Sequence, residues 1–307
     1  MPKDLNELPR LRDSLSYLYI EKAVIERDKN AIVLIRGDER IAVPVSSLTV
    51  LMMGPGTSVT HAAIRVMSDS GCMVVWCGEH ALRYYALGMG ETHSAEQITV
   101  QALHFADVEK RLHVARKMFS IRFPGIPVDT LSMQQLRGLE GVRVREAYKL
   151  MAKKYDVPWK GRNYNPDLWD KADELNIALS TANVCLYSLC HAAIVTLGYS
   201  PALGFVHTGK QMSFVYDIAD LYKVTTTIPV AFEAVSSPRT QDIDKTVRLL
   251  CRQTFRKQGV LKRIPLDLAN LFEYDVNEGD KGEAVGKLWD EQLGEVEGGK
   301  NYSGVEL

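Results

Sequence analysis

The hydrophobic pattern of this chain changes its period once, near residue 90, and that change limits the folds open to it. Up to Leu87, apolar residues stand in short β-rich runs separated by turns such as 28–30 and 36–38. From Ser94 onward they recur at the i, i+3, i+4 spacing of amphipathic helices. Strands that precede helices without alternating with them are typical of an α+β protein. We therefore predict a β-rich N-terminal domain joined to a mainly α-helical C-terminal domain.

The boundaries of these parts follow from local signals. We expect a β-rich domain over 1–88, a linker over 89–94, a helical domain over 95–277 and an acidic, flexible tail over 278–307. Ser94 with Gln97, and Ser132 with Gln135, have the spacing of helix capping boxes. The expected strands cover 15–20, 23–27, 31–36, 41–45, 48–52, 73–77 and 83–87, with one helix over 58–67 among them. The expected helices of the second domain cover 95–121, 133–155, 175–197, 213–223 and 242–257.

Composition narrows the class of protein. The 307 residues contain five cysteines, an odd number with no C-x-x-C pair, which indicates reduced thiols and no zinc knuckle. We find no apolar run of the length that spans a bilayer, and residues 1–10 lack the apolar centre of a secretory signal. We therefore expect a cytoplasmic protein.

The formal net charge of −1 hides an uneven distribution. Residues 267–307 carry 11 acidic and 3 basic residues, a net charge of −8, while residues 1–266 carry 27 acidic and 34 basic residues, a net charge of +7. A basic body suggests a polyanionic partner. Ordinary solubilising charge is the alternative.

The stretch 204–223 carries the densest chemistry. His207 stands just ahead of Asp217 and Asp220, and the expected helix over 213–223 places both aspartates along one edge of an apolar stripe. Two carboxylates beside buried surface repel each other and resist dehydration unless a cation lies between them. A solvated helix edge with a turn histidine before it explains the pattern equally well.

The same stretch resembles a phosphate-binding loop without being one. Residues 204–210 read G-x-x-x-x-G-K, but Gln211 stands where that loop needs a Ser or Thr hydroxyl for magnesium. The preceding residues, 192–201, have the pattern of a helix end and turn where the loop requires a strand. We therefore exclude a nucleotide hydrolase.

Glu140 is a second candidate, because glycines at 138 and 141 flank it inside an expected helix. Each glycine costs about 1 kcal/mol relative to alanine there, and it also clears the helix surface for the approach of a bulky backbone. Arginines at 137, 143 and 145 surround the carboxylate with positive charge. The alternative is a surface glutamate paired with arginine.

Basic residues are grouped in three segments. One face of the expected helix 242–257 and the helix carrying Lys110, Arg111, Arg116, Lys117 and Arg122 are two of them. In the third, residues 159–169, basic and aromatic side chains interleave as they do where unpaired bases stack. A solvated helix face is the usual alternative for any one segment. The candidate DNA-binding residues are Arg65, Arg83, Arg137, Tyr164, Trp169, Lys210, Lys245, Arg248, Arg252 and Arg256.

Three motifs give the chain a resemblance to a known family. Leu136-Arg-Gly-Leu-Glu-Gly141, Gly204-Phe-Val-His-Thr-Gly209 and Ser213-Phe-Val-Tyr-Asp-Ile-Ala-Asp220 resemble the active-site motifs of Cas1, the CRISPR-associated integrase of spacer acquisition. Residues 55–65, Pro-Gly-Thr-Ser-Val-Thr-His-Ala-Ala-Ile-Arg, are most similar to its type I-E branch. The resemblance runs from about Leu11 to Pro265.

The resemblance implies a site and an assembly. Glu140, His207 and Asp220 would be the metal ligands, with Asp217 beside them as a fourth catalytic residue. Three carboxylates and an imidazole suit Mg²⁺ or Mn²⁺ better than zinc, and the imidazole favours Mn²⁺. The family pattern also implies a homodimer formed through the N-terminal domain, and assembly with the small partner protein Cas2.

The implied activity is a metal-dependent DNA integrase and endonuclease. It would insert short double-stranded protospacers into a CRISPR repeat beside the leader by 3′-hydroxyl transesterification. Two alternatives stay open: a metal-dependent nuclease that cuts branched DNA, and a non-catalytic DNA-binding scaffold.

Overall fold

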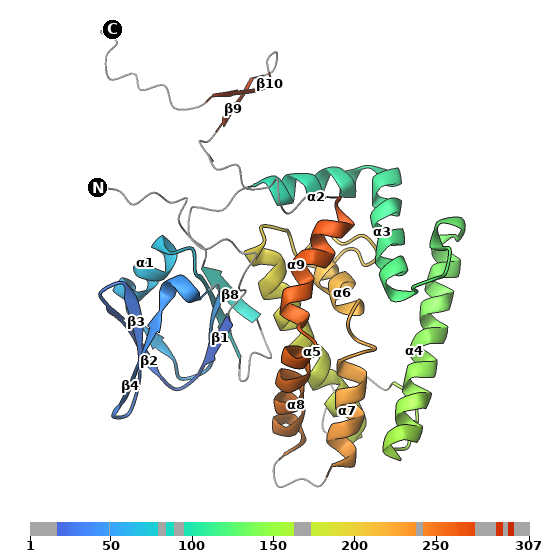
Figure 1. Cartoon of the computed structure of the whole chain (residues 1–307), viewed down its shortest axis with the longest axis horizontal. Helices are drawn as coiled ribbons and strands as arrows, with labels where there is room; N and C mark the ends of the chain where they lie inside the picture. Colours follow the sequence, from blue (N-terminus) through green and yellow to red (C-terminus); the bar gives the residue numbers. More distant parts are fainter. Residues whose placement is uncertain are drawn as a thin grey trace.

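The computed structural model describes residues 17–48, 50–78, 84–88, 95–162, 173–237, 242–273, 287–290 and 294–297. Strands dominate up to Gly88, and helices dominate from Glu96 (Figure 1). The predicted fold class, β-rich and then mainly α-helical, is confirmed. The predicted linker falls in the interval between those two residues, and residues 89–94 lie outside the described part.

The strands form two four-stranded sheets. One has the order β1-β5-β7-β8, with β1 parallel to β5, β5 parallel to β7, and β8 antiparallel to β7. The other has the order β4-β3-β2-β6 and is antiparallel except for the short β2–β6 pair. The strand bounds are Tyr17–Ile20 (β1), Val24–Asp28 (β2), Ala31–Arg36 (β3), Glu39–Pro44 (β4), Val50–Met53 (β5), Ser58–Val59 (β6), Met73–Cys77 (β7) and Tyr84–Gly88 (β8).

The two sheets and helix α1 (His61–Asp69) enclose one apolar core, to which Ile25, Leu51 and Met67 contribute fully buried side chains. The outer face of the first sheet buries Val50 and Met73 against Ala192 of the helical region. The two regions are therefore joined by packing as well as by the chain.

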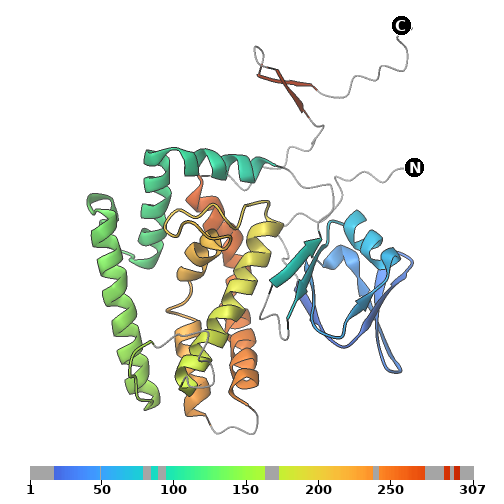
Figure 2. The ribbon, with the colours of Figure 1, turned by 180° about the vertical axis from the view of Figure 1, so that it is seen from behind.

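The helical region is built around α5 (Glu174–Thr196), which runs through its centre (Figures 1 and 2). Its buried residues cover most of its surface, as expected of a helix packed on several sides. The other helices are α2 (Glu96–Ala106), α3 (Val108–Arg122), α4 (Met133–Tyr155), α6 (Ser213–Asp220), α7 (Thr227–Ser236), α8 (Ile243–Lys257) and α9 (Val260–Leu271).

Helix α5 corrects the expectation that no apolar run of this chain is long enough to span a bilayer. Glu174–Thr196 is long and apolar enough to cross a membrane by length and hydropathy alone, with a mean hydropathy of 1.5 over its most apolar window. Of that window, 67% is buried inside the protein. The apolar length of α5 is thus accounted for by the core that it forms.

Several predicted elements differ in detail. The helix expected over 95–121 breaks at Asp107, whose side chain caps α3 by accepting the Lys110 backbone N–H. Helices α7 and α9 were not predicted, and α9 contains Pro265, which normally disfavours a helix interior. The capping box of Ser132 and Gln135 is confirmed, with both reciprocal hydrogen bonds present.

Two further predictions concern Ser94 and residues 278–307. The expected capping residue Ser94 lies outside the described residues, as does most of the predicted flexible tail. Within 278–307, which we expect to be an acidic, flexible tail, the structure describes two antiparallel strands, β9 (Lys287–Asp290) and β10 (Gly294–Glu297).

The turn that leads from α5 to α6 is so tight at Gly204 that it leaves no room for a side chain. A Cβ added there would lie 2.3 Å from the His207 carbonyl oxygen and 2.8 Å from the Ser213 carbonyl carbon. Because both are backbone atoms, Gly204→Ala should lower the free energy of unfolding by about 1–3 kcal/mol, the usual cost of overpacking. Urea denaturation would measure it.

The matched control is Gly138→Ala, because a Cβ at Gly138 meets nothing within 4 Å. That change should raise the free energy of unfolding by about 0.5–1 kcal/mol through helix propensity. Equal stability of the two variants would contradict the tight turn.

Candidate active site

A buried carboxylate organises the loop between α5 and α6. Asp217 is fully buried, and its side chain accepts the backbone N–H groups of Phe205 at 2.6 Å, Val206 at 3.1 Å and His207 at 2.9 Å. Three successive amides thus converge on one anion, as they do in phosphate-binding loops. The anion here is the protein's own side chain, which supports the exclusion of a nucleotide hydrolase.

The same carboxylate orients His207. Asp217 Oδ1 lies 2.7 Å from His207 Nδ1, so Nδ1 carries the proton and, in the neutral ring, Nε2 carries the lone pair that can bind a metal ion. This hydrogen bond raises the pKa of His207 above its usual value, against the opposing effect of partial burial. The His207 side chain is 43% exposed, and its Nε2 lies 3.9 Å from Asp220 Oδ2.

Asp220 is held from its other side by a lysine. Its Oδ1 lies 2.6 Å from Lys223 Nζ, one helical turn further along the chain. Burial alone would lower the pKa of Lys223, but the adjacent Asp220 carboxylate and Tyr187 raise it well above the ordinary value. The pair is therefore a charged ion pair at neutral pH.

This geometry corrects our description of the two aspartates. We predicted that Asp217 and Asp220 lie side by side and repel each other. In the structure the His207 ring lies between them, four donors satisfy Asp217, and Lys223 neutralises Asp220. Asp217 lies behind the imidazole and is not among the residues that line the cavity described below, so the structure places it beside the expected metal ligands, in contact with one of them.

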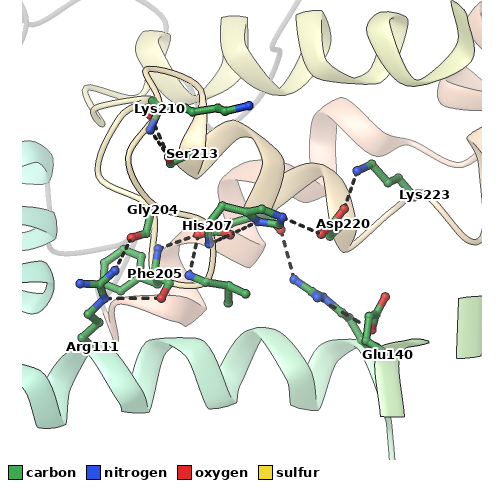
Figure 3. Close-up of polar contacts among 12 residues, drawn as sticks. Arg111, Glu140, Gly204, Phe205, His207, Lys210, Ser213, Asp220 and Lys223 are labelled. Atoms are coloured by element: carbon green, nitrogen blue, oxygen red, sulfur yellow. Dashed lines mark hydrogen bonds and ion pairs between the residues drawn. The ribbon is translucent and has the colours of Figure 1, made fainter. Parts of the chain in front are cut away.

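Glu140 reaches the same region from α4 (Figure 3). Its Oε1 lies 3.5 Å from Arg143 Nη1, and its Oε2 lies 3.8 Å from Arg122 Nη1. Burial raises the pKa of the Glu140 carboxyl, while the two guanidinium groups oppose that rise. Among the described residues Oε2 has no hydrogen-bond partner. The flanking glycines leave the helix surface open, as predicted, with nothing within 4 Å of a Cβ at either position.

Glu140, His207 and Asp220 line one cavity of about 910 Å³. It extends from these three residues along α4 and α5 toward the start of α8. Its polar lining also includes Tyr148, Arg162, Ser180, Thr181, Asn183, Tyr187, Tyr216, Lys223 and Asp244.

The donor atoms suit a hard divalent cation, although they do not yet enclose one. Within the described ranges, no three His, Cys, Asp or Glu side chains are gathered closely enough to hold a metal ion. The chemistry nevertheless fits: Glu140 Oε2 is a buried acceptor without a hydrogen bond, and Asp217 fixes His207 Nε2 toward the cavity. A cation entering here would compete with Lys223 and the two arginines for the carboxylates.

The predicted DNA-binding residues lie in several places. Lys245, Arg252 and Arg256 are exposed on one face of α8, whose opposite face buries Val247 and Phe255, whereas Arg248 is half-buried. Arg137 on α4 and Lys210 in the loop before α6 are exposed, while Arg65 on α1 lies 3.7 Å from Asp69 in the β-rich region. Arg83, Tyr164 and Trp169 lie outside the described residues.

The basic helix 108–122 does not present the cationic face that we predicted. Arg111 donates to the Gly204 carbonyl at 3.2 Å (Figure 3), and Lys117 pairs with Glu273 at 2.8 Å. The Arg122 side chain is 1% exposed and faces Glu140. These basic residues therefore hold neighbouring segments of the protein together.

Sequence reasoning missed two residues at the site. Lys223 could have been found, because it follows Asp220 at the i, i+3 spacing of helical ion pairs. The burial of Arg122 had no such signal, since its neighbours in sequence include other basic residues that are partly exposed.

Comparison with known proteins gives consistent results. The family described as "CRISPR associated protein Cas1" matches residues 16–124 and 128–258. A "CRISPR-associated endonuclease Cas1 2" of Thermus thermophilus is 45% identical, over 98% of this chain and 94% of that protein. A "CRISPR-associated endonuclease Cas1" of Escherichia coli is 44% identical, over 85% and 86% respectively. The crystal structure of a TtCas1–DNA complex superposes with a TM-score of 0.75 at 46% identity, covering 86% of this chain and 99% of that one.

If Asp217 and Asp220 repelled each other, replacing Asp220 by Asn would raise the stability of the protein. The ion pair of Asp220 and Lys223 predicts the opposite. Asp220→Asn should lower the melting temperature in the presence of chelator, because it leaves the Lys223 ammonium largely buried without its counter-ion. The cost should be about 1–3 kcal/mol, the usual penalty for stranding a buried polar group. Thermal melting followed by circular dichroism measures this.

The control is the double variant Asp220→Asn/Lys223→Met, which removes both charges and should recover most of the lost stability. A higher melting temperature for Asp220→Asn alone would restore the repulsion that we first predicted.

Proposed function

This chain belongs to the CRISPR-associated Cas1 family of endonucleases, and from that membership we propose that it is the metal-dependent DNA integrase of CRISPR adaptation. The proposed donor is a short duplex with free 3′-hydroxyls, and the proposed target is a repeat beside the leader of a CRISPR array. Such a reaction on cellular DNA agrees with the cytoplasmic location that we expect.

One observation carries the proposal: Glu140, His207 and Asp220 come from α4, a loop and α6 to line a single cavity. We propose these three as the ligands of Mg²⁺ or Mn²⁺. When bound, the ion would lower the pKa of an attacking hydroxyl and neutralise charge that grows on the phosphate. Asp217 keeps His207 in the tautomer that presents Nε2, and Lys223 holds Asp220 in place through a contact of 2.6 Å.

The proposed chemistry exchanges one phosphodiester for another. The donor 3′-oxygen forms a bond to phosphorus in the target strand, and the bond from that phosphorus to the displaced strand end breaks. The number of ester bonds is unchanged, so no nucleotide hydrolysis is needed. That agrees with a 204–210 loop in which the amides of Phe205, Val206 and His207 are already occupied by Asp217.

The exposed basic face of α8, defined by Lys245, Arg252 and Arg256, is the proposed contact for DNA phosphates. The structure of a TtCas1–DNA complex shows that a protein of similar fold and 46% identity binds DNA, which supports the proposal. A homodimer formed through the N-terminal domain and a complex with Cas2 remain proposals from family membership.

A nuclease that acts on branched DNA would use the same site, with water in place of the 3′-hydroxyl. A donor whose ends lack the 3′-hydroxyl separates the two activities. Strand joining should be abolished with this donor, whereas cleavage of branched DNA does not need a 3′-hydroxyl. A non-catalytic scaffold would bind DNA without turnover under any metal.

A strand-joining assay tests the proposed reaction. Mn²⁺ or Mg²⁺ should support joining and a chelator should stop it. Glu140→Ala, His207→Ala and Asp220→Ala should each lower the rate by roughly 100-fold or more, as when one charge-stabilising group is lost from an active site. Glu146→Ala, an exposed carboxylate on the same helix as Glu140, is the control and should keep the parent rate. Undiminished joining by His207→Ala would remove that residue from the site.

Salt dependence tests the α8 face. Replacing Lys245, Arg252 and Arg256 together by Ala should weaken duplex binding about equally across sequences. It should also flatten the plot of log K against log salt by about 0.9 for each phosphate that the variant no longer neutralises. The matched control replaces Lys149, Lys153 and Lys154 of α4, which are also exposed, by Ala. An unchanged slope in the α8 variant alone would mean that this face is only solvated.

A further inference from the structure

Arg122 occupies an unusual place for a charged residue at the end of a helix. Its side chain is 1% exposed, its guanidinium carbon lies 4.9 Å from the centre of the Phe119 ring, and its Nη2 donates to the Asp217 carbonyl at 3.4 Å. Its Nη1 lies 3.8 Å from Glu140 Oε2. One guanidinium on α3 therefore contacts both Glu140 on α4 and the backbone of α6, the helix that carries Asp217 and Asp220.

The contacts of Arg122 are poor for a residue that only stabilises the fold. Its buried Nε has no hydrogen-bond partner among the described residues. A buried ion pair costs desolvation, and a well-packed apolar side chain often stabilises a protein as much or more. This geometry indicates a role in arranging other groups.

What Arg122 arranges is the position of Glu140. At 3.8 Å the contact is too long for a hydrogen bond, so the guanidinium balances the carboxylate charge and leaves the Oε2 lone pairs unused. Arg143 lies at a similar distance, 3.5 Å from Oε1, but it sits on the same helix as Glu140. Of the two arginines, Arg122 is the one that ties Glu140 to α6.

We propose that Arg122 is a positioning residue that fixes the Glu140 carboxylate relative to His207 and Asp220, and thereby sets the affinity of the site for a divalent cation. The inference rests on the proposed metal site. It extends that site to a residue outside the three ligands, and its test does not depend on turnover.

Simple electrostatics predicts the opposite sign. A fixed positive charge beside a cation site repels the ion, so removing it should tighten binding. Positioning predicts weaker binding, because partners that hold a ligating carboxylate in place typically contribute about 10- to 100-fold to metal affinity. The sign of the change therefore separates the two accounts.

The experiment measures Mn²⁺ binding to the full-length protein by the loss of the free-ion electron paramagnetic resonance signal. Arg122→Met should raise the Mn²⁺ dissociation constant by about 10- to 100-fold. Arg143→Met removes the same charge at a similar distance without the link to α6, and it should change the constant by no more than about threefold. Tighter binding by Arg122→Met, or equal weakening by both variants, overturns the proposal.

A double-variant cycle shows whether Arg122 acts through Glu140. If it does, Arg122→Met should add no further weakening in a Glu140→Gln background, where His207 and Asp220 bind Mn²⁺ alone. Additive losses overturn the proposal, because they mean that Arg122 affects the site by another route.

Arg122→Lys covers the case in which the methionine variant does not fold. A lysine keeps the charge, but a single ammonium cannot replace the two arms that reach Glu140 and Asp217, so binding should again weaken. A parent-like constant for Arg122→Lys overturns the proposal. If the parent itself binds no Mn²⁺, the metal site falls and the inference with it; if the parent binds Mn²⁺ and Arg122→Met binds equally well, the inference alone falls.

Discussion

The site depends on one buried carboxylate, that of Asp217. A fully buried charge is tolerated only when its acceptor capacity is filled, and three backbone amides and the His207 ring do this. These contacts have two effects. The amides shape the loop from Gly204 to His207, and the ring is held with Nε2 toward the cavity. Because Asp217 sits one turn before Asp220 in α6, the same anchor fixes where Asp220 points.

Around that anchor, opposite charges are interleaved. Lys223 faces Asp220, while Arg122 and Arg143 face Glu140, so both of these carboxylates have a cation beside them. These pairs let acidic groups gather beside apolar helices with little net repulsion. They also set a condition for any incoming cation, which must offer the carboxylates more than lysine and arginine already do. The arrangement therefore favours a small ion of high charge density over a monovalent one.

The sequence predicted the elements and residues that depend on local spacing, but it did not predict those whose position depends on packing between distant segments. Strand runs, the Ser132 capping box and the helix carrying Glu140 follow from spacing and turn chemistry, and the structure has them. Helix α9 was missed because Pro265 is a general helix breaker, whereas packing against α5 and α8 here outweighs that cost. Glu140, His207 and Asp220 were found because their motifs are distinctive. The place of Asp217 behind the ring depends on how the loop before α6 folds back onto that helix, which residue spacing does not show. The burial of Arg122 depends on a contact between segments 95 residues apart in sequence.

The central position of α5 governs when the site can exist at all. Glu140 precedes α5 in the chain, while His207 and Asp220 follow it, so the groups that line the cavity meet only after α5 has packed between its neighbours. During synthesis, a nascent chain that has not yet passed Asp220 has the carboxylate of Glu140 but not the full set of three residues that line the cavity. Closure over such sequence separations is slow compared with helix formation and proceeds together with collapse of the whole helical half. The three side chains that line the cavity are therefore brought together in the same step as the tertiary structure of the helical region.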